Sequence, residues 1–84
     1  MGRSGEFDSF VYETLVKVYL EKGRPVHTRT VHGGLSREES SFLYGINKLD
    51  DIRDSLFSLS KRGLVRVYTK EVGGHLSYYW EPID

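Results

Sequence analysis

The hydrophobic residues near the start of the chain repeat with the spacing of an amphipathic helix. Winding this stretch as an α-helix places one set of apolar side chains on a single side: Phe7, Val11, Leu15, Val18 and Tyr19. Charged residues fall opposite them, Asp8 or Ser9 can cap the start, and Gly23 follows the last turn. The pattern predicts a helix over residues 8–22.

Two large hydrophobic residues, Phe10 and Leu20, fall toward the polar side of that helix. They are either isolated surface hydrophobes, which are common on soluble proteins, or the contact between two copies of the chain. Both interpretations stay open, and the second predicts a homodimer that forms through this helix; the C-terminal strand is the alternative dimer contact.

The segment after this helix carries mixed signals. Pro25 disfavours helix in the residue before it, so a short strand is expected around Val26. Residues 28–35 contain β-branched residues, and the Gly33–Gly34 pair is expected to end any helix there, so at most one or two turns of helix are expected. Residues 36–39 read SREE, a capping-box pattern, which predicts a helix over residues 37–44.

The strongest helical pattern covers residues 48–62. Its hydrophobic residues recur at spacings of three and four: Leu49, Ile52, Leu56 and Leu59. Acidic residues occupy the first turn, basic residues occupy the last, and Gly63 follows. All three features favour a helix that ends near Arg62.

The C-terminal stretch, residues 64–82, is rich in Val, Tyr and Trp and is interrupted by Gly73–Gly74, which predicts a β-hairpin. A two-residue turn pairs Val72 with His75, Lys70 with Ser77, Tyr68 with Tyr79, and Arg66 with Glu81. One face then belongs to the core and holds Val65, Val67, Leu76, Tyr78 and Trp80. The outer face holds Arg66, Tyr68, Lys70, His75, Ser77 and Tyr79.

Composition narrows the function classes. With 84 residues we expect one α+β domain over residues 7–84, after a small, polar and flexible lead-in at residues 1–6. The 12 Lys+Arg balance the 12 Asp+Glu, so any nucleic-acid binding must come from a local patch. The chain has no cysteine, phosphate loop, metal-ligand spacing or nucleophile motif, so we expect no enzyme activity, cofactor or metal site. Neither a membrane span nor a signal peptide is visible, and a cytoplasmic protein is expected.

The order of elements resembles the winged-helix (winged helix-turn-helix) superfamily over about residues 8–82. The Pro25–Val26 strand follows the first helix, and residues 56–65 (LFSLSKRGLV) are similar to the passage by which many small archaeal and bacterial transcription regulators enter their wing. The resemblance implies three to four helices and a C-terminal two-stranded antiparallel hairpin, the wing. Members bind DNA, bind RNA or serve as protein-interaction modules, so the fold supplies only a prior for function.

The stretch from Gly34 to Gly63 is longer than this family usually has, which leaves two assignments of the helix-turn-helix. In the favoured one, residues 37–44 form the second helix, residues 45–47 the turn and residues 48–62 the recognition helix. In the other, a short helix over residues 28–33 comes second, and residues 37–44 form an inserted or recognition helix.

A recognition helix over residues 48–62 would turn three carboxylates toward DNA: Asp50, Asp51 and Asp54. These acids either compensate the dipole at the helix start or dock a protein partner. Lys48 and Arg53 flank them and could still reach a DNA backbone.

The outer face of the hairpin is the better candidate, because its basic residues alternate with tyrosines, a combination that suits phosphate contact and stacking. Candidate contacts there are Lys61, Arg62, Arg66, Tyr68, Lys70 and His75, and a second group in the middle segment comprises Arg29, His32 and Arg37. The alternative is a solvated face in which Arg66 pairs with Glu81 and the tyrosines pack across strands. Two functions therefore remain: a regulator that binds double-stranded DNA through helix and wing, and a protein-interaction module in a larger assembly without direct DNA binding.

Overall fold

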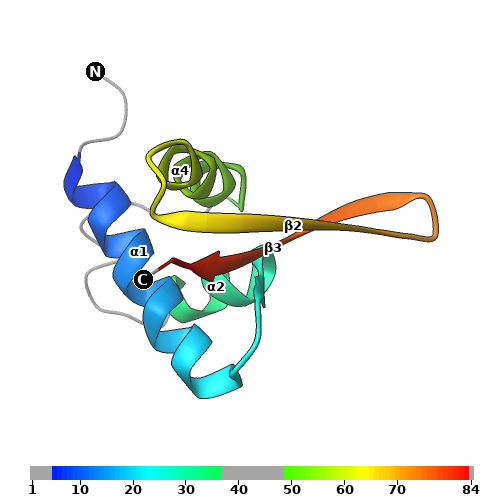
Figure 1. Cartoon of the computed structure of the whole chain (residues 1–84), viewed down its shortest axis with the longest axis horizontal. Coiled ribbons are helices and arrows are strands. Elements are labelled where there is room, and N and C mark those ends of the chain that lie inside the picture. The colour runs from blue at the N-terminus through cyan, green and yellow to red at the C-terminus, as the bar shows by residue number, and fades with distance from the viewer. Residues whose placement is uncertain (1–4, 37–48, 84) are drawn as a thin grey trace.

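The computed structural model describes residues 5–36 and 49–83, which form an α+β fold with three helices and a three-stranded antiparallel sheet (Figure 1). In chain order the elements are α1 (Gly5–Lys22), β1 (Val26–His27), α2 (Thr28–Ser36), α4 (Leu49–Lys61), β2 (Val65–Val72) and β3 (His75–Pro82). The strand order is β1-β3-β2. The helices gather around the root of the β2–β3 hairpin, and the rest of the hairpin projects beyond them (Figure 1).

Helix α1 buries the side that the sequence pattern predicts, with Val11 and Leu15 fully buried and Tyr19 packed at the edge of the core. The helix begins at Gly5 and therefore includes the last two residues of the expected lead-in. Asp8 consequently lies inside α1 and is buried, so it does not cap the helix start. None of the helices that the structure describes has the length and apolar composition needed to cross a lipid bilayer.

Helix α2 is longer than the sequence predicts. Its nine residues continue through Gly33 and Gly34, so the expectation that this glycine pair ends the helix is wrong. Val31 and Leu35 are fully buried, and a Cβ at Gly34 would lie 3.1 Å from Thr14 Cγ2. Packing against α1 therefore stabilises α2 despite its weak helix propensity.

The position of α2 also bears on the two helix-turn-helix assignments. The second helix in the chain is Thr28–Ser36, so the favoured assignment, which made residues 37–44 the second helix, is wrong on that point. The expected helix at residues 37–44 and the expected turn at residues 45–47 lie outside the described residues.

Helix α4 covers the expected stretch and ends at Lys61, as its charge pattern predicts. Ile52, Leu56 and Leu59 are buried, and the N–H of Leu64 donates to the carbonyl of Leu59 at 3.0 Å, which closes the last turn. The Phe57 ring meets the ring of Trp80 edge-on, with centroids 5.0 Å apart. One face of the hairpin thus packs on α4.

The hairpin has the pairs that a two-residue turn requires, including Tyr68 with Tyr79 and Val72 with His75. Gly73 and Gly74 both have positive φ, 58° and 82°, which suits the tight turn of a twisted hairpin. At the root, Trp80 is fully buried and its Nε1–H donates to Thr28 Oγ1 at 2.7 Å. The root of the hairpin is therefore part of the core.

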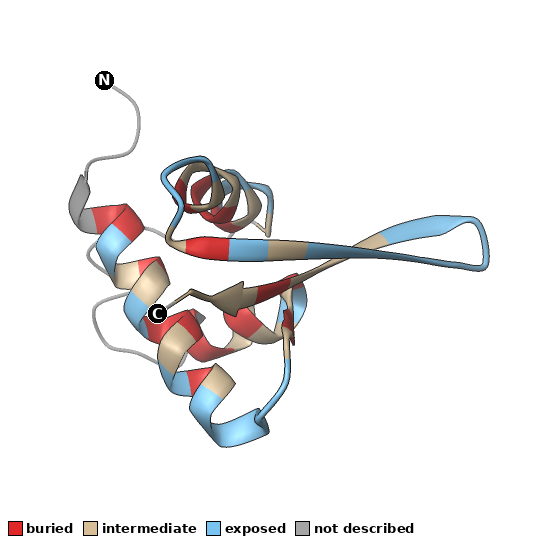
Figure 2. Cartoon of the chain, viewed as in Figure 1, coloured by how far each residue is buried: buried red, intermediate tan, exposed pale blue. Residues whose placement is uncertain are grey.

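The tip of the hairpin differs from the expectation. Leu76 was expected in the core by strand alternation, yet it is 56% exposed, and Val72 is 58% exposed. The exposed colour covers the tip of the hairpin, which projects beyond the helices (Figure 2). Strand alternation correctly predicts which face of the hairpin a residue occupies. The core-side face, however, extends beyond the hydrophobic core, so its residues near the tip are exposed.

Candidate functional site

A groove of about 610 Å³ lies where the end of α1, strand β1 and the hairpin meet. It is lined by Lys22, Arg24, Pro25, Val26, His27, Thr30, Tyr68, Thr69, Lys70 and Tyr79. Its volume is in the range of small-molecule sites. We call this feature the sheet groove.

Three aromatic rings form a row across the sheet within this groove. His27 pairs with Tyr79 on β3, and Tyr79 pairs with Tyr68 on β2. Paired residues of antiparallel strands share a face, so the three rings lie on one side of the sheet. The neighbouring row, in which Trp80 is fully buried, faces the core, so the rings face away from it.

The charge of the sheet groove is entirely positive. Lys22, Arg24 and Lys70 line it, and none of its ten lining residues is acidic. None of these three cations forms an ion pair with a carboxylate of a described residue. The end of α1 and the start of α2 both adjoin the groove, and the charged side chains that line it are all basic.

His27 is held in place by the start of α2. The backbone N–H of Arg29 donates to His27 Nδ1 at 3.0 Å, and the His27 ring meets the Tyr79 ring edge-on at 5.1 Å between centroids. A neutral imidazole that accepts at Nδ1 carries its proton on Nε2. The ring is therefore oriented by the fold and keeps one N–H donor.

Glu81 organises the neighbouring part of the same face. Tyr68 Oη donates to Glu81 Oε1 at 2.8 Å, Tyr19 Oη donates to Oε2 at 3.0 Å, and the Arg66 guanidinium lies 3.8 Å from Oε1. The hydrogen bonds from Tyr68 and Tyr19, and the charge of Arg66, lower the pKa of Glu81. Tyr68 also raises the pKa of Arg66. The predicted alternative pairing of Arg66 with Glu81 is thus confirmed, and it offsets the charge of this arginine.

Two further predicted contacts are also engaged within the chain. Arg62 lies 3.8 Å from the buried carboxylate of Asp8, which also accepts hydrogen bonds from Ser55 at 2.6 Å and Ser58 at 3.3 Å. Arg53 pairs with Asp50 at 2.6 Å. Arg62 and Arg53 therefore offset the negative charge of acidic residues within the chain.

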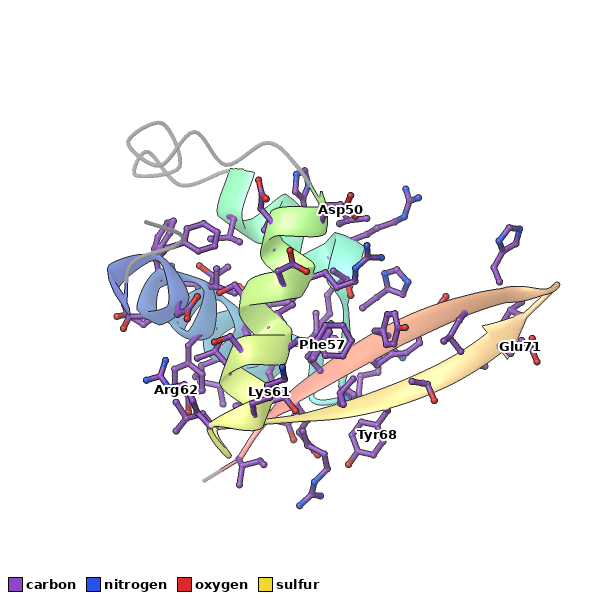
Figure 3. All side chains as sticks on the ribbon, turned by 90° about the horizontal axis from the view of Figure 1, so that it is seen from above. Asp50, Phe57, Lys61, Arg62, Tyr68 and Glu71 are labelled. Carbon is purple, nitrogen blue, oxygen red and sulfur yellow. The ribbon has the colours of Figure 1, made fainter. Side chains whose placement is uncertain are left out.

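The labelled side chains show how the candidate residues are distributed (Figure 3). Asp50 lies at the start of α4, Lys61 and Arg62 lie at its other end, and Tyr68 lies on the side of the hairpin away from α4. Phe57 points from α4 toward the strands. The start of α4 and the outer face of the sheet are consequently separate surfaces.

Of the predicted nucleic-acid contacts, Tyr68 and Lys70 line the sheet groove. Arg29 is exposed in the first turn of α2, Lys61 is exposed at the end of α4, and His75 is exposed at the hairpin tip. Arg37 and Lys48 lie outside the described residues.

Sequence reasoning missed Lys22, Arg24 and His27. It counted Tyr79 among the tyrosines of the outer face that suit stacking, but it did not list this residue among the candidate contacts. The signal available was a run of basic residues around Pro25, with His27 at the predicted strand. That signal became informative only because β1 pairs with β3, which brings this run beside Lys70 and Tyr79.

The predicted dimer contact changes as well. Phe10 is partly buried against the core, so the expectation that it faces outward is wrong in that respect. Leu20 is 75% exposed, as expected. Of the two residues, only Leu20 remains a predicted dimer contact on this helix.

Comparisons with protein-family models, with curated proteins and with solved structures gave no match.

Proposed function

We propose that this protein is a nucleic-acid-binding domain of winged-helix type that contacts double-stranded DNA through the outer face of its sheet. The observation that carries the proposal is the sheet groove, where Lys22, Arg24 and Lys70 converge with no acidic residue among the lining residues, in a chain of zero net charge. Clustered cations attract phosphates because binding releases condensed counterions. The projecting hairpin beside the groove supports the wing-like role.

The acidic residues at the start of α4 argue against this helix as the main contact with DNA. Asp50 and Asp51 are exposed at its start, and Arg53 is paired with Asp50. A helix that enters the major groove presents its N-terminal residues to base edges between two rows of phosphates. The exposed carboxylates would be repelled there, so DNA binding depends on the sheet rather than on α4.

Fluorescence anisotropy with a labelled DNA duplex, repeated over a series of salt concentrations, tests this proposal. Reversing the charge at both Arg24 and Lys70 (R24E/K70E) should weaken binding strongly, and it should lower the slope of log affinity against log salt by about 2, because each neutralised phosphate contributes about 0.9. Both residues are exposed, so the fold should tolerate the change.

Lys61→Glu is the matched control, because Lys61 is an exposed cation outside the sheet groove. It should leave the salt slope unchanged. If the single charge reversal at Lys61 weakens binding as much as one at Lys70, binding follows net charge and the assignment to the groove is wrong.

A protein-interaction module is the second candidate function. The exposed Val72 and Leu76 at the hairpin tip and the acids at the start of α4 favour it. Non-specific DNA binding typically has a Kd of about 10⁻⁶ to 10⁻⁴ M. Failure of the unmodified chain to bind duplex DNA at low salt and tens of micromolar protein, well within that range, would favour the protein partner.

A further inference from the structure

We infer that the sheet groove holds a single nucleotide, with an unpaired base against Tyr79 and Tyr68 and its phosphate between the basic side chains. The inference rests on the proposed function, since both use the same cations. The proposed function requires only contacts with phosphates, and the inference adds the binding of an exposed aromatic base.

The aromatic row supplies the base-binding half of this site. Tyr79 is half-buried, Tyr68 is 40% exposed, and both line the groove on the face that points away from the core. Rings on an outer face of a sheet can stack with bases, and such stacking tolerates any base because every base has a π-face. A duplex stacks its bases internally, so it cannot offer a base to these rings without opening.

Three contacts hold the row in place before a ligand arrives. Tyr68 donates its hydroxyl hydrogen to Glu81, and His27 accepts the N–H of Arg29 while its ring meets Tyr79 edge-on. A site whose side chains are already fixed loses less conformational entropy on binding. The rings therefore form a platform that the fold orders in advance.

The phosphate-binding half comes from two distant parts of the chain. Lys22 and Arg24 flank the turn after α1, and Lys70 projects from β2. Thr30, which also lines the groove, and the remaining N–H of His27 add uncharged donors. Cations and donors around an aromatic platform match an anionic aromatic ligand, and the absence of carboxylates among the lining residues removes the main source of repulsion.

This chemistry is shared by a free nucleotide and by an unpaired nucleotide within a strand. Three probes separate these sources from duplex binding: adenosine monophosphate, a fluorescein-labelled single-stranded oligothymidine, and a labelled duplex. Direct anisotropy measures the two labelled probes, and titration calorimetry measures the mononucleotide.

Tyr79→Leu removes the ring, and Tyr79→Phe is the matched control that keeps it. We expect Tyr79→Leu to weaken binding of at least one unpaired probe, the mononucleotide or the single strand, by roughly fivefold or more, the lower end of stacking per base. Tyr79→Phe should bind that probe like the unmodified chain, and both variants should bind the duplex equally well. Lys70→Glu should weaken every probe that binds.

Circular dichroism and thermal melting of each variant verify that the sheet is intact. Equal affinities of the Leu and Phe variants for both unpaired probes would overturn the inference. If the duplex still binds through Lys70 in that case, the proposed function stands without it. If the unmodified chain binds none of the three probes, both the inference and the proposed function are wrong.

Discussion

The two glycines of α2 provide a controlled test of how α1 and α2 pack. A Cβ added at Gly33 meets nothing within 4 Å, whereas a Cβ at Gly34 would lie 3.1 Å from Thr14 Cγ2 and 3.2 Å from Val18 Cγ2. Both positions are helical, so alanine gains about 0.5–1 kcal/mol of helix stability at either one. Only at Gly34 is this gain opposed by overpacking, which typically costs about 1–3 kcal/mol.

Gly33→Ala should therefore stabilise the domain, and Gly34→Ala should unfold about 1–3 kcal/mol more easily than Gly33→Ala. For a domain of this size the difference corresponds to at least about 4–8 °C in Tm, which thermal melting followed by circular dichroism resolves. Thr14→Ser removes one of the two methyl groups and should restore part of the loss in the Gly34→Ala background. Equal melting temperatures for the two alanine variants would refute the close approach of α1 and α2.

Two further predictions concern buried and paired carboxylates. Asp8→Ala leaves the fully buried hydroxyl of Ser55 without its 2.6 Å acceptor, so the free energy of unfolding, measured in urea, should fall by about 1–3 kcal/mol. Ser58→Ala removes the other serine hydrogen bond to Asp8 at a half-buried position and should cost less. Equal losses for the two variants would contradict this ranking. Glu81 has a lowered pKa, so its stabilisation is complete above the ordinary carboxyl pKa and disappears as the pH falls through the lowered one. Glu81→Gln should therefore reduce the acid dependence of Tm in that range, and an unchanged pH profile would show that ionisation of the Glu81 carboxyl does not stabilise the fold.

The longest elements were predictable because their patterns are local. The spacing of Val11, Leu15 and Val18 predicts α1, and Gly73–Gly74 predicts the turn and register of the hairpin. Helix α2 was underestimated for the opposite reason. Its β-branched residues and glycine pair weaken it as an isolated helix, but Val31 and Leu35 are buried and Gly34 admits α1, so tertiary packing outweighs local propensity.

The candidate site was only partly predictable for a related reason. Tyr68 and Lys70 follow from strand alternation, which places them on the outer face. Arg24 and His27 reach the same place through β1, a strand of two residues that is too short to leave a periodic pattern. The pairing of Arg66 with Glu81 was one of the predicted alternatives, because it follows from the hairpin register. The pairing of Arg62 with Asp8 joins residues distant in sequence and that of Arg53 with Asp50 depends on rotamers, so counting charges overestimated the basic surface.

His27 takes part in three structures at once: it pairs with Tyr79 in the sheet, accepts the N–H of Arg29 at the start of α2, and lines the groove. The groove therefore exists only when the helix start and the sheet edge are both formed. A ligand that requires this geometry has no affinity for the unfolded chain, so binding and folding are thermodynamically linked. At a ligand concentration 100 times its Kd, the linkage adds about 2.7 kcal/mol to the free energy of unfolding. The melting temperature of the whole domain thus reports occupancy of one groove on its surface.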